Sequence, residues 1–282
     1  MTETRMPDGR VVVVGTPIGN LGDLSPRAVA ALEGADVVAC EDTRRSGRLL
    51  QHAGIPGKRL VRLDDHTEAA VTADLVARAA AGDRVALVSD AGLPGLSDPG
   101  AVLVAAAWSA GVAVEVVPGP FAAAVGLVGS GMLEPSGRFC FEGFLPRKGP
   151  ARRTRIAALV GEERTTVLYE APHRLRSTME DLRDALGADR GVALCRELTK
   201  LHEETWRGTL ADAVDRCAEV EPRGEFVVVL AGAEPPPDVT DDELRRALER
   251  ELETGASRRD AAATVAARFD VAPNRVKRLL SG

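Results

Sequence analysis

The sequence predicts two α/β domains followed by a small helical appendage. Short apolar runs rich in Val and Leu alternate with helical stretches, which is typical of strands and helices arranged around a mostly parallel sheet. The runs are nearly continuous in apolar residues, as in strands that are covered on both faces. We therefore expect an N-terminal α/β domain at 1–130, a second α/β domain at 131–234, and a linker with a helix-turn-helix-like tail at 235–282.

The first domain is expected to contain five strands and several helices with clear start signals. The expected strands are 10–14, 36–40, 59–63, 84–89 and 112–117. Ser25 before Pro26 is an N-cap signal, and Gly34 can end that helix. Thr67 and Asp98 are expected to cap two further helices in the same way, and an apolar helix is expected at about 121–128.

The same sequence signals predict the strands and helices of the second domain and of the tail. The expected strands are 139–144, 165–169, 192–196, 204–207 and 225–230, and the expected helices are 151–160, 173–186 and 210–218. The triplet Pro235–Pro237 predicts a linker. Residues 241–282 then predict two or three short helices around Gly255 and Pro273. Ser257 and Asp260 form an N-terminal capping pattern there.

Composition excludes several classes of protein. The net charge of −6 argues against a protein that coats nucleic acid indiscriminately, although a structured RNA can still be bound through local basic patches. The four cysteines and four histidines show no metal-ligand spacing, so we expect no metal site. The polar start and the absence of a long apolar stretch predict a cytoplasmic protein that does not bind membranes.

Three Gly- or Pro-rich loops follow predicted strands. The first, Gly15–Asn20, is not a dinucleotide-binding G-x-G-x-x-G, because Pro17 and Ile18 occupy its middle. It is compatible either with a simple strand-to-helix turn or with backbone that is presented to a ligand. We therefore leave both interpretations open for this loop.

The second loop, 89–100, is the most informative stretch, since ligands of open α/β sheets bind past the carboxyl ends of strands. Asp90 there can accept hydrogen bonds from a cofactor, whereas Asp98 is expected to act only as a helix cap. The third loop, 117–120, leads into Phe121 and Ala122, where small residues leave room for a flat group such as adenine. Ordinary helix packing explains the third loop equally well.

The order of these motifs resembles a known family. The motifs are V-G-T-P-I-G-N-L-G-D-L-S-P-R-A at 14–28, C-E-D-T-R at 40–44, S-D-A-G-x-P-x-x-S-D-P-G at 89–100, V-P-G-P at 117–120, F-x-G-F-L-P-R-K at 141–148, Y-E-A-P-H-R at 169–174 and R-E-L-T-K at 196–200. Together they resemble the tetrapyrrole-methylase superfamily, and within it the branch of ribosomal RNA small subunit methyltransferase I. Members that methylate tetrapyrroles usually carry G-x-G-P-G and G-D-P in the first two loops, and this sequence has neither.

The resemblance implies a two-domain tetrapyrrole-methylase-like fold that binds S-adenosyl-L-methionine between its domains. It implies cofactor contacts from Pro17, Ile18, Asp90, Leu93, Phe121, Ala122 and Tyr169. The implied reaction is 2′-O-methylation of a cytidine ribose in the decoding centre of 16S rRNA, on the 30S particle and by a homodimer. A porphyrinoid methyltransferase of the same fold, or a non-catalytic 30S assembly factor, remains an alternative.

Methyl transfer requires the acceptor oxygen to be held in line, about 3 Å from the methyl group. Charged residues in three motif loops are candidates for orienting or activating it. Our first choice for the acceptor side is the group Glu41, Asp42 and Arg44, and further candidates are Glu170, His173, Arg174, Glu197 and Lys200. For any one of these residues, an ion pair or a helix cap is the more common role.

Two clusters of basic residues are candidates for RNA binding. Residues 147–155 contain five basic and no acidic side chains, among them Arg147, Lys148, Arg152 and Arg153, and so predict a phosphate-contacting patch. The alternative is a solvated helix start. Residues 255–282 carry six basic and two acidic side chains, and Arg275, Lys277 and Arg278 are its RNA-binding candidates. Packing of the tail is the open alternative there.

Overall fold

A computed structural model of the chain describes residues 9–64, 66–234 and 239–280. The chain divides into two compact units, with the boundary between Ala233 and Glu234. The first unit contains two five-stranded sheets with their helices, which are described below as the first and the second domain, and the second unit contains the helical tail. The expected linker Pro235–Pro237 lies outside the described residues.

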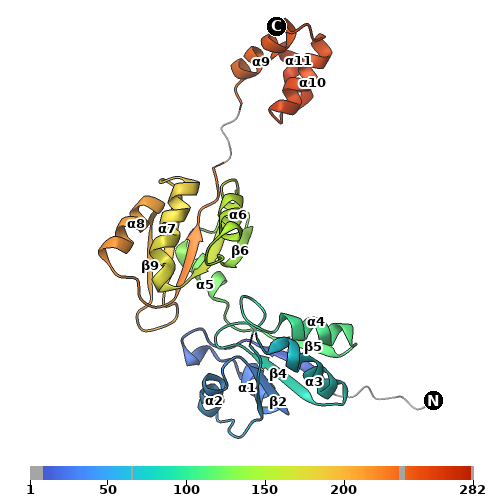
Figure 1. Cartoon of the computed structure of the whole chain (residues 1–282), viewed down its shortest axis with the longest axis vertical. Coiled ribbons are helices and arrows are strands. Elements are labelled where there is room, and N and C mark those ends of the chain that lie inside the picture. Colours follow the sequence, from blue (N-terminus) through green and yellow to red (C-terminus); the bar gives the residue numbers. More distant parts are fainter. Residues whose placement is uncertain (1–8, 65, 235–238, 281–282) are drawn as a thin grey trace, which may run out of the picture. The chain divides into compact units, whose positions relative to one another are not determined.

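The first domain contains a sheet of five parallel strands in the order β3-β2-β4-β1-β5 (Figure 1). The strands are β1 (Arg10–Val14), β2 (Val37–Cys40), β3 (Leu60–Arg62), β4 (Arg84–Val88) and β5 (Ala113–Val117). All five fall within the predicted ranges, because apolar runs bounded by Gly, Pro or Asp are a strong signal for buried parallel strands.

Both faces of this sheet are covered by helices. Val11 and Val13 pack with buried residues of α3 (Glu68–Ala80) and α4 (Ala101–Ser109). Val12 and Val14 pack on the opposite side with α1 (Pro26–Glu33) and α2 (Thr43–His52). The alternation follows from the two-residue period of a strand. A short 3-10 helix, η1 (Leu21–Asp23), follows the first loop.

The second domain has a five-stranded mixed sheet in the order β6-β7-β10-β8-β9. Its strands are β6 (Phe139–Phe144), β7 (Thr165–Glu170), β8 (Gly191–Arg196), β9 (Glu204–Thr209) and β10 (Phe226–Leu230). Here β6 and β7 are parallel, and the other neighbours are antiparallel. Helices α6 (Pro150–Leu159), α7 (Pro172–Leu186) and α8 (Leu210–Glu219) pack on one face, and α5 (Ala122–Ser130) packs on the other.

The tail consists of α9 (Asp241–Glu253), α10 (Arg258–Arg268) and α11 (Pro273–Leu279). It has its own hydrophobic core, which includes Leu244, Leu248, Val265 and Val276. The predicted cap of α10 is confirmed, since the Asp260 amide donates to the Ser257 hydroxyl at 3.2 Å. A 42-residue helical segment with its own core can fold as a separate unit, although its small size makes it only marginally stable.

The start of α4 corrects one prediction. The cap predicted at Ser25 is confirmed, but Asp98 does not cap α4, which begins at Ala101. The buried carboxylate of Glu68 replaces it: its Oε1 accepts hydrogen bonds from the amides of Gly100, Val102 and Leu103 at 2.9, 3.0 and 3.3 Å. A charge at a helix N-terminus is stabilised by the helix dipole, so a carboxylate from a neighbouring helix serves as well as a local one.

Thr67 also differs from the prediction. It occupies the N-cap position of α3, but its hydroxyl makes no cap hydrogen bond. The hydroxyl donates instead to the Asp64 carboxylate at 2.9 Å. The side chain thus closes the turn that precedes α3.

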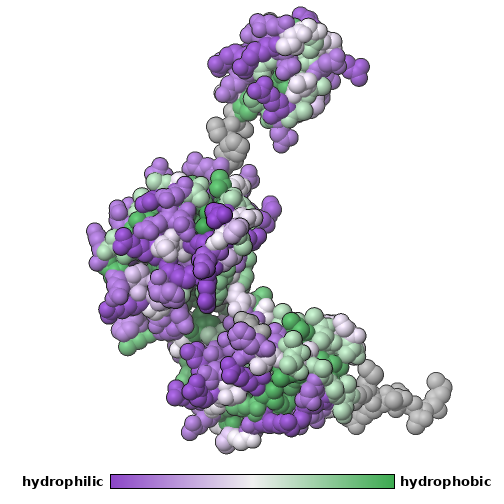
Figure 2. Space-filling view, viewed as in Figure 1, coloured by the Kyte–Doolittle hydropathy of each residue, from purple (hydrophilic) through white to green (hydrophobic). Residues whose placement is uncertain are grey.

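The outer surface of α4 and β5 is apolar. Val102 and Trp108 of α4 are 50% and 68% exposed, and Val116 of the edge strand β5 is 51% exposed. Figure 2 shows hydrophobic surface over the region where Figure 1 places α4 and β5. Apolar side chains grouped on an edge strand and an adjacent helix are typical of a surface that another chain covers.

Removing the Glu68 carboxylate is expected to destabilise the first unit. Glu68→Ala should lower the free energy of unfolding by about 1–3 kcal/mol, because buried amides at the start of α4 lose their acceptor. Urea denaturation measures the change. Asp74→Ala on the exposed side of the same helix is the control and should shift stability by less than about 0.5 kcal/mol. Equal effects of the two substitutions would contradict a special role for Glu68.

Candidate functional site

The three Gly- and Pro-rich loops meet at the carboxyl ends of β1, β4 and β5. Thr16 and Gly92 exchange backbone hydrogen bonds of 2.8 and 3.2 Å, which join the first loop to the second. The Gly15 amide donates to the Val117 carbonyl at 3.0 Å. A Cβ at Gly15 would lie 2.5 Å from the amide nitrogen of Gly119, so this contact requires glycine. The loops therefore form one rigid platform.

A cavity of about 270 Å³ opens between this platform and the second sheet. Five of the seven residues predicted to contact the cofactor line it: Ile18, Leu93, Phe121, Ala122 and Tyr169. Asp98, which we expected to be only a cap, also lines it. The remaining wall comes mainly from the second domain and includes Phe144, Pro172, Cys195, Leu198 and Val227. A mostly apolar hollow with a few polar groups is typical of a small-molecule site.

An aromatic row borders the cavity. The ring of Phe141 contacts Phe121 and Tyr169 edge to face, with both centroid distances at 5.1 Å, and Phe144 lies 5.5 Å from Tyr169. The Tyr169 hydroxyl accepts a hydrogen bond from the Ala123 amide at 3.2 Å. Burial raises the pKa of Tyr169 to about 12, so the phenol stays neutral at physiological pH. Sequence reasoning missed Phe141 and Phe144, although the F-x-G-F motif contains both.

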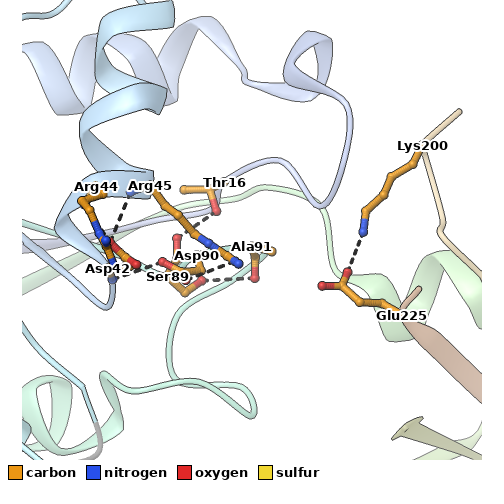
Figure 3. Close-up of polar contacts among 9 residues, drawn as sticks. All are labelled: Thr16, Asp42, Arg44, Arg45, Ser89, Asp90, Ala91, Lys200 and Glu225. Carbon is orange, nitrogen blue, oxygen red and sulfur yellow. Dashed lines mark hydrogen bonds and ion pairs between the residues drawn. The ribbon is translucent and has the colours of Figure 1, made fainter. Parts of the chain in front are cut away.

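Two predicted cofactor contacts, Pro17 and Asp90, do not line this cavity. Both border a separate, smaller hollow of about 220 Å³, which is lined also by residues of α2 such as Ser46 and Leu49. The Asp90 carboxylate accepts a hydrogen bond from the Asp42 amide at 3.2 Å and pairs with Arg45 at 3.3 Å (Figure 3). Asp90 thus joins the ends of β4 and β2, and its oxygens already have protein partners.

Asp90 also borders a polar hollow of about 420 Å³, together with the predicted acceptor-side residues Glu41, Asp42 and Arg44. Asp42 caps α2 and accepts from the amides of Arg44 and Arg45 at 2.8 and 3.4 Å. These amide hydrogen bonds lower the pKa of Asp42, which makes it a weaker base than an ordinary carboxylate. The Arg44 side chain pairs with Asp42 at 3.6 Å and is 88% exposed.

Lys200 stands in a strained loop. Its ammonium group pairs with Glu197 at 2.9 Å. It also pairs with Glu225 at 2.7 Å (Figure 3). Burial opposes the charged form, but hydrogen bonds to Glu225 and Glu197 outweigh it and raise the pKa of Lys200. Glu197 and Thr199 adopt positive φ values of 49° and 65°. The loop packs against Gly19, where a Cβ would lie 2.4 Å from Lys200 Cγ. These contacts hold the second domain against the first loop.

The motif Y-E-A-P-H-R forms a buried network. The Glu170 carboxylate accepts from the Thr178 hydroxyl at 2.6 Å and pairs with Arg174 at 3.3 Å, while His173 is exposed. Glu170 is almost completely buried, so this ion pair is a structural one.

The first basic cluster does not act as a single surface. Arg147, Lys148 and Arg153 are exposed, but Arg152 is buried. The prediction that Arg152 contacts RNA is therefore wrong. Its guanidinium donates to Asp181 at 2.8 Å, to Thr178 at 3.0 Å and to the Pro146 carbonyl at 3.1 Å. These bonds tie α6 to α7 and to the preceding loop.

The tail cluster divides in a similar way. Arg275 donates to Asp241 at 3.0 Å and to the Val239 carbonyl at 2.6 Å, so it fastens α11 to the start of α9. Lys277 and Arg278 are exposed on α11. Arg275 therefore has a structural role within the tail, and the other two side chains face solvent.

Within residues 9–64, 66–234 and 239–280, no group of three or more His, Cys, Asp or Glu side chains is arranged to hold a metal ion. In the same part of the chain, no helix has the length and apolar character needed to span a membrane.

Comparisons with known proteins agree with this architecture. Residues 10–214 match the family model of Tetrapyrrole (Corrin/Porphyrin) Methylases. Ribosomal RNA small subunit methyltransferase I of Synechocystis sp. is 45% identical over 92% of this chain and 92% of its own. The protein of the same name from Mycobacterium tuberculosis is 46% identical, over 93% of this chain and 90% of its own.

A solved structure shows the same fold. It is uroporphyrin-III C-methyltransferase from Thermus thermophilus in complex with S-adenosyl homocysteine, with a TM-score of 0.57 and 21% identity, covering 79% of this chain and 97% of that one. The matching sheets, the three joined loops and the extent of the sequence identity lead to one assignment. The chain is a methyltransferase that belongs to the tetrapyrrole methylase family, in its group of ribosomal RNA small subunit methyltransferase I.

Proposed function

We propose that the protein transfers a methyl group from S-adenosyl-L-methionine to the ribose 2′-hydroxyl of a cytidine in the decoding centre of 16S rRNA, on the 30S particle in the cytoplasm. The observation that carries the proposal is the cavity at the three joined loops, in a chain about 45% identical to named rRNA methyltransferases. The G-x-G-P-G and G-D-P turns usual in tetrapyrrole-methylating members are absent from these loops.

The residues of the cavity fit the cofactor. Phe121 and Ala122 at the start of α5 line the cavity together with Gly92 and Leu93 of the second loop, and we assign this part of the wall to the adenine. Hydrogen-bonding groups and apolar walls of this kind suit an adenosine and a methionine chain. When bound, the cofactor supplies an activated methyl group. The protein then has to orient the acceptor and exclude water.

The acceptor side is proposed to be the polar hollow bordered by Glu41, Asp42, Arg44 and Asp90. Asp90 is assigned here because it borders this hollow and its carboxylate accepts a hydrogen bond from the amide of Asp42, another lining residue. Arg44 is exposed and suits a phosphate beside the target nucleotide. The lowered pKa makes Asp42 a poor base, which would remove a proton from the ribose 2′-hydroxyl inefficiently. We therefore assign Asp42 a role in orienting that hydroxyl, from its position at the first turn of α2.

We further propose that two copies of the chain associate through the apolar surface of α4 and β5. The exposed Val102, Trp108 and Val116 support this interface, because a second copy would remove them from water. An unpaired edge strand also offers backbone groups for pairing across a two-fold axis.

The proposed reaction is tested by titrating the protein with S-adenosyl-L-methionine and then measuring methyl transfer to 30S particles. Saturable cofactor binding and a 2′-O-methylcytidine mapped to the decoding centre are expected. Transfer to a free porphyrinoid instead would identify a tetrapyrrole methyltransferase. Particle binding without cofactor affinity would identify an assembly factor.

Filling the cavity is expected to weaken cofactor binding. Ala122→Leu adds three carbons to the cavity wall and should raise the cofactor Kd by about 5- to 150-fold, equivalent to an overpacking cost of about 1–3 kcal/mol. Isothermal titration measures the Kd. Val125→Leu, on the exposed side of the same helix, is the control and should leave it unchanged. An unaltered Kd for Ala122→Leu would exclude this cavity as the cofactor site.

The exposed basic side chains are expected to contact phosphate, and Arg152 is not. Replacing Arg147, Lys148 and Arg153 by Ser should flatten the salt dependence of 30S binding by about 2 in log–log slope, since each contact to single-stranded RNA contributes about 0.7. Melting temperature and cofactor Kd should not change. The contrasting variant Arg152→Ser should instead lower stability by about 1–3 kcal/mol, because the buried Thr178 hydroxyl, Asp181 and the Pro146 carbonyl each lose a donor. An unchanged slope in the triple variant would make the patch ordinary solvated surface.

The tail is expected to contribute RNA contacts through Lys277 and Arg278. A chain that ends at Glu234 should keep the melting temperature and cofactor Kd of the first unit, because the two units have separate cores. Its binding to 30S particles should show a salt slope smaller by about 1–2, as expected for two lost phosphate contacts. A lower melting temperature together with weaker cofactor binding would show instead that the tail acts by packing.

A further inference from the structure

Aromatic residues are scarce in this protein, and they are concentrated at one place. The chain contains six phenylalanines, two tryptophans and one tyrosine. Four of these nine residues form the row Phe121, Phe141, Tyr169 and Phe144 at the cavity. The buried core elsewhere consists mainly of Ala, Val and Leu, with Phe226 as a buried aromatic residue, so most of it is packed without aromatic rings. The concentration therefore points to a ligand with flat rings.

The two ends of the row differ in exposure. Phe121, Phe141 and Tyr169 are partly buried in the apolar cluster between α5 and the second sheet. Phe144 is 52% exposed, the highest value among the six phenylalanines, and yet it lines the cavity. Its ring thus contacts Tyr169, lines the cavity and is also exposed to solvent.

A bulge in β6 fixes this orientation. Phe141 pairs with Val167, and Phe144 pairs with Tyr169. The two phenylalanines are three positions apart in the sequence, whereas their partners are only two positions apart. The extra residue places both phenylalanines on the same face of the sheet. The bulge depends on Gly143, which has φ 62° and whose Cβ would lie 2.5 Å from the Ser97 hydroxyl. The backbone of β6 therefore determines the position of the exposed Phe144 ring.

Two arginine side chains fix the backbone of the basic loop that follows Phe144. The partly buried Arg174 donates to the Leu145 carbonyl at 2.8 Å, and the buried Arg152 donates to the Pro146 carbonyl at 3.1 Å. These two bonds fix the backbone immediately before Arg147 and Lys148. Four residues span at most about 14 Å, so both cations lie within reach of the backbone of a nucleotide whose base contacts Phe144.

From this arrangement we infer that Phe144 is a stacking platform for an unpaired RNA base at the opening of the cofactor cavity, and that Arg147 and Lys148 hold the phosphates beside that base. The inference rests on the proposed function. Proteins that bind single-stranded RNA commonly combine an exposed aromatic face with a basic groove along the backbone. Arg152 and Arg174 act as positioning residues for this element.

The test compares three full-length variants in methylation of 30S particles, with cofactor Kd measured in parallel. Phe144→Leu keeps the apolar volume but removes the ring, and it should lower kcat/KM by about 5- to 150-fold through KM, the range for losing one base–aromatic stack. Its melting temperature should stay at the parental value, and its cofactor Kd should rise far less than KM, because most of the cavity wall is unchanged. Phe144→Trp retains a flat ring and should restore activity to within about twofold. The matched control Phe139→Leu alters an exposed ring at the other end of β6 that does not line the cavity, and it should have no effect.

Four results would overturn the inference. A cofactor Kd that rises as much as KM would make Phe144 a wall of the cofactor site only. Unchanged kinetics in Phe144→Leu would show that no base stacks there. An equal loss in Phe139→Leu would indicate a general effect of surface aromatics. If the parent protein transfers no methyl group to 30S particles or to 16S rRNA, the proposed function is wrong, and the stacking role is wrong with it. The parent protein alone shows this result, so it is distinguished from the three results that need a variant.

Discussion

The contact of the first loop with its two neighbours is the constraint on which the site depends. Gly15 can approach Gly119 only because neither residue has a side chain, and Thr16 then bonds to the backbone of Gly92. These contacts fix the carboxyl ends of β1, β4 and β5 next to one another at one edge of the sheet. The cavity wall contributed by the first domain follows from these contacts, since Ile18, Leu93 and Phe121 each lie within a few residues of them. Rigid scaffolding of this kind allows loops to form a defined binding surface.

Much of the fold could be predicted because its signals are local. Each strand of the first sheet is a short apolar run with Gly, Pro or Asp at its ends, and Ser25 and Ser257 cap the helices that follow them. The start of α4 could not be predicted, because its acceptor comes from Glu68, more than thirty residues earlier. Asp98 is the nearest acidic residue in the sequence, but in the folded chain it is Glu68 of α3 that accepts from the amides at the start of α4.

The site was predicted in part for the same reason. Motif resemblance led to Ile18, Leu93, Phe121, Ala122 and Tyr169, all of which line one cavity, and it also led to Asp90, whose carboxylate faces a different hollow. A loop motif identifies the backbone that approaches a ligand, but the direction of a side chain depends on its partners in other elements. Arg152 illustrates the limit: its charge and position match a surface patch, yet Thr178 and Asp181 on α7 draw it inward. The row formed by Phe141 and Phe144 depends on a bulge that has no sequence signature beyond a glycine.

The carboxylate of Glu68 also bears on how the first domain assembles. Helix α4 is rich in Ala and Val and has no capping side chain of its own, so its first turn is stabilised only after α3 has docked on the same face of the sheet. Isolated helices of nine residues are marginal in water. We therefore expect α3, β4 and α4 to form as one cooperative folding unit. In this unit, the N-terminal cap of α4 comes from α3, which is synthesised before it. The segment that carries the second loop would then become ordered in the same step as the helices that flank it.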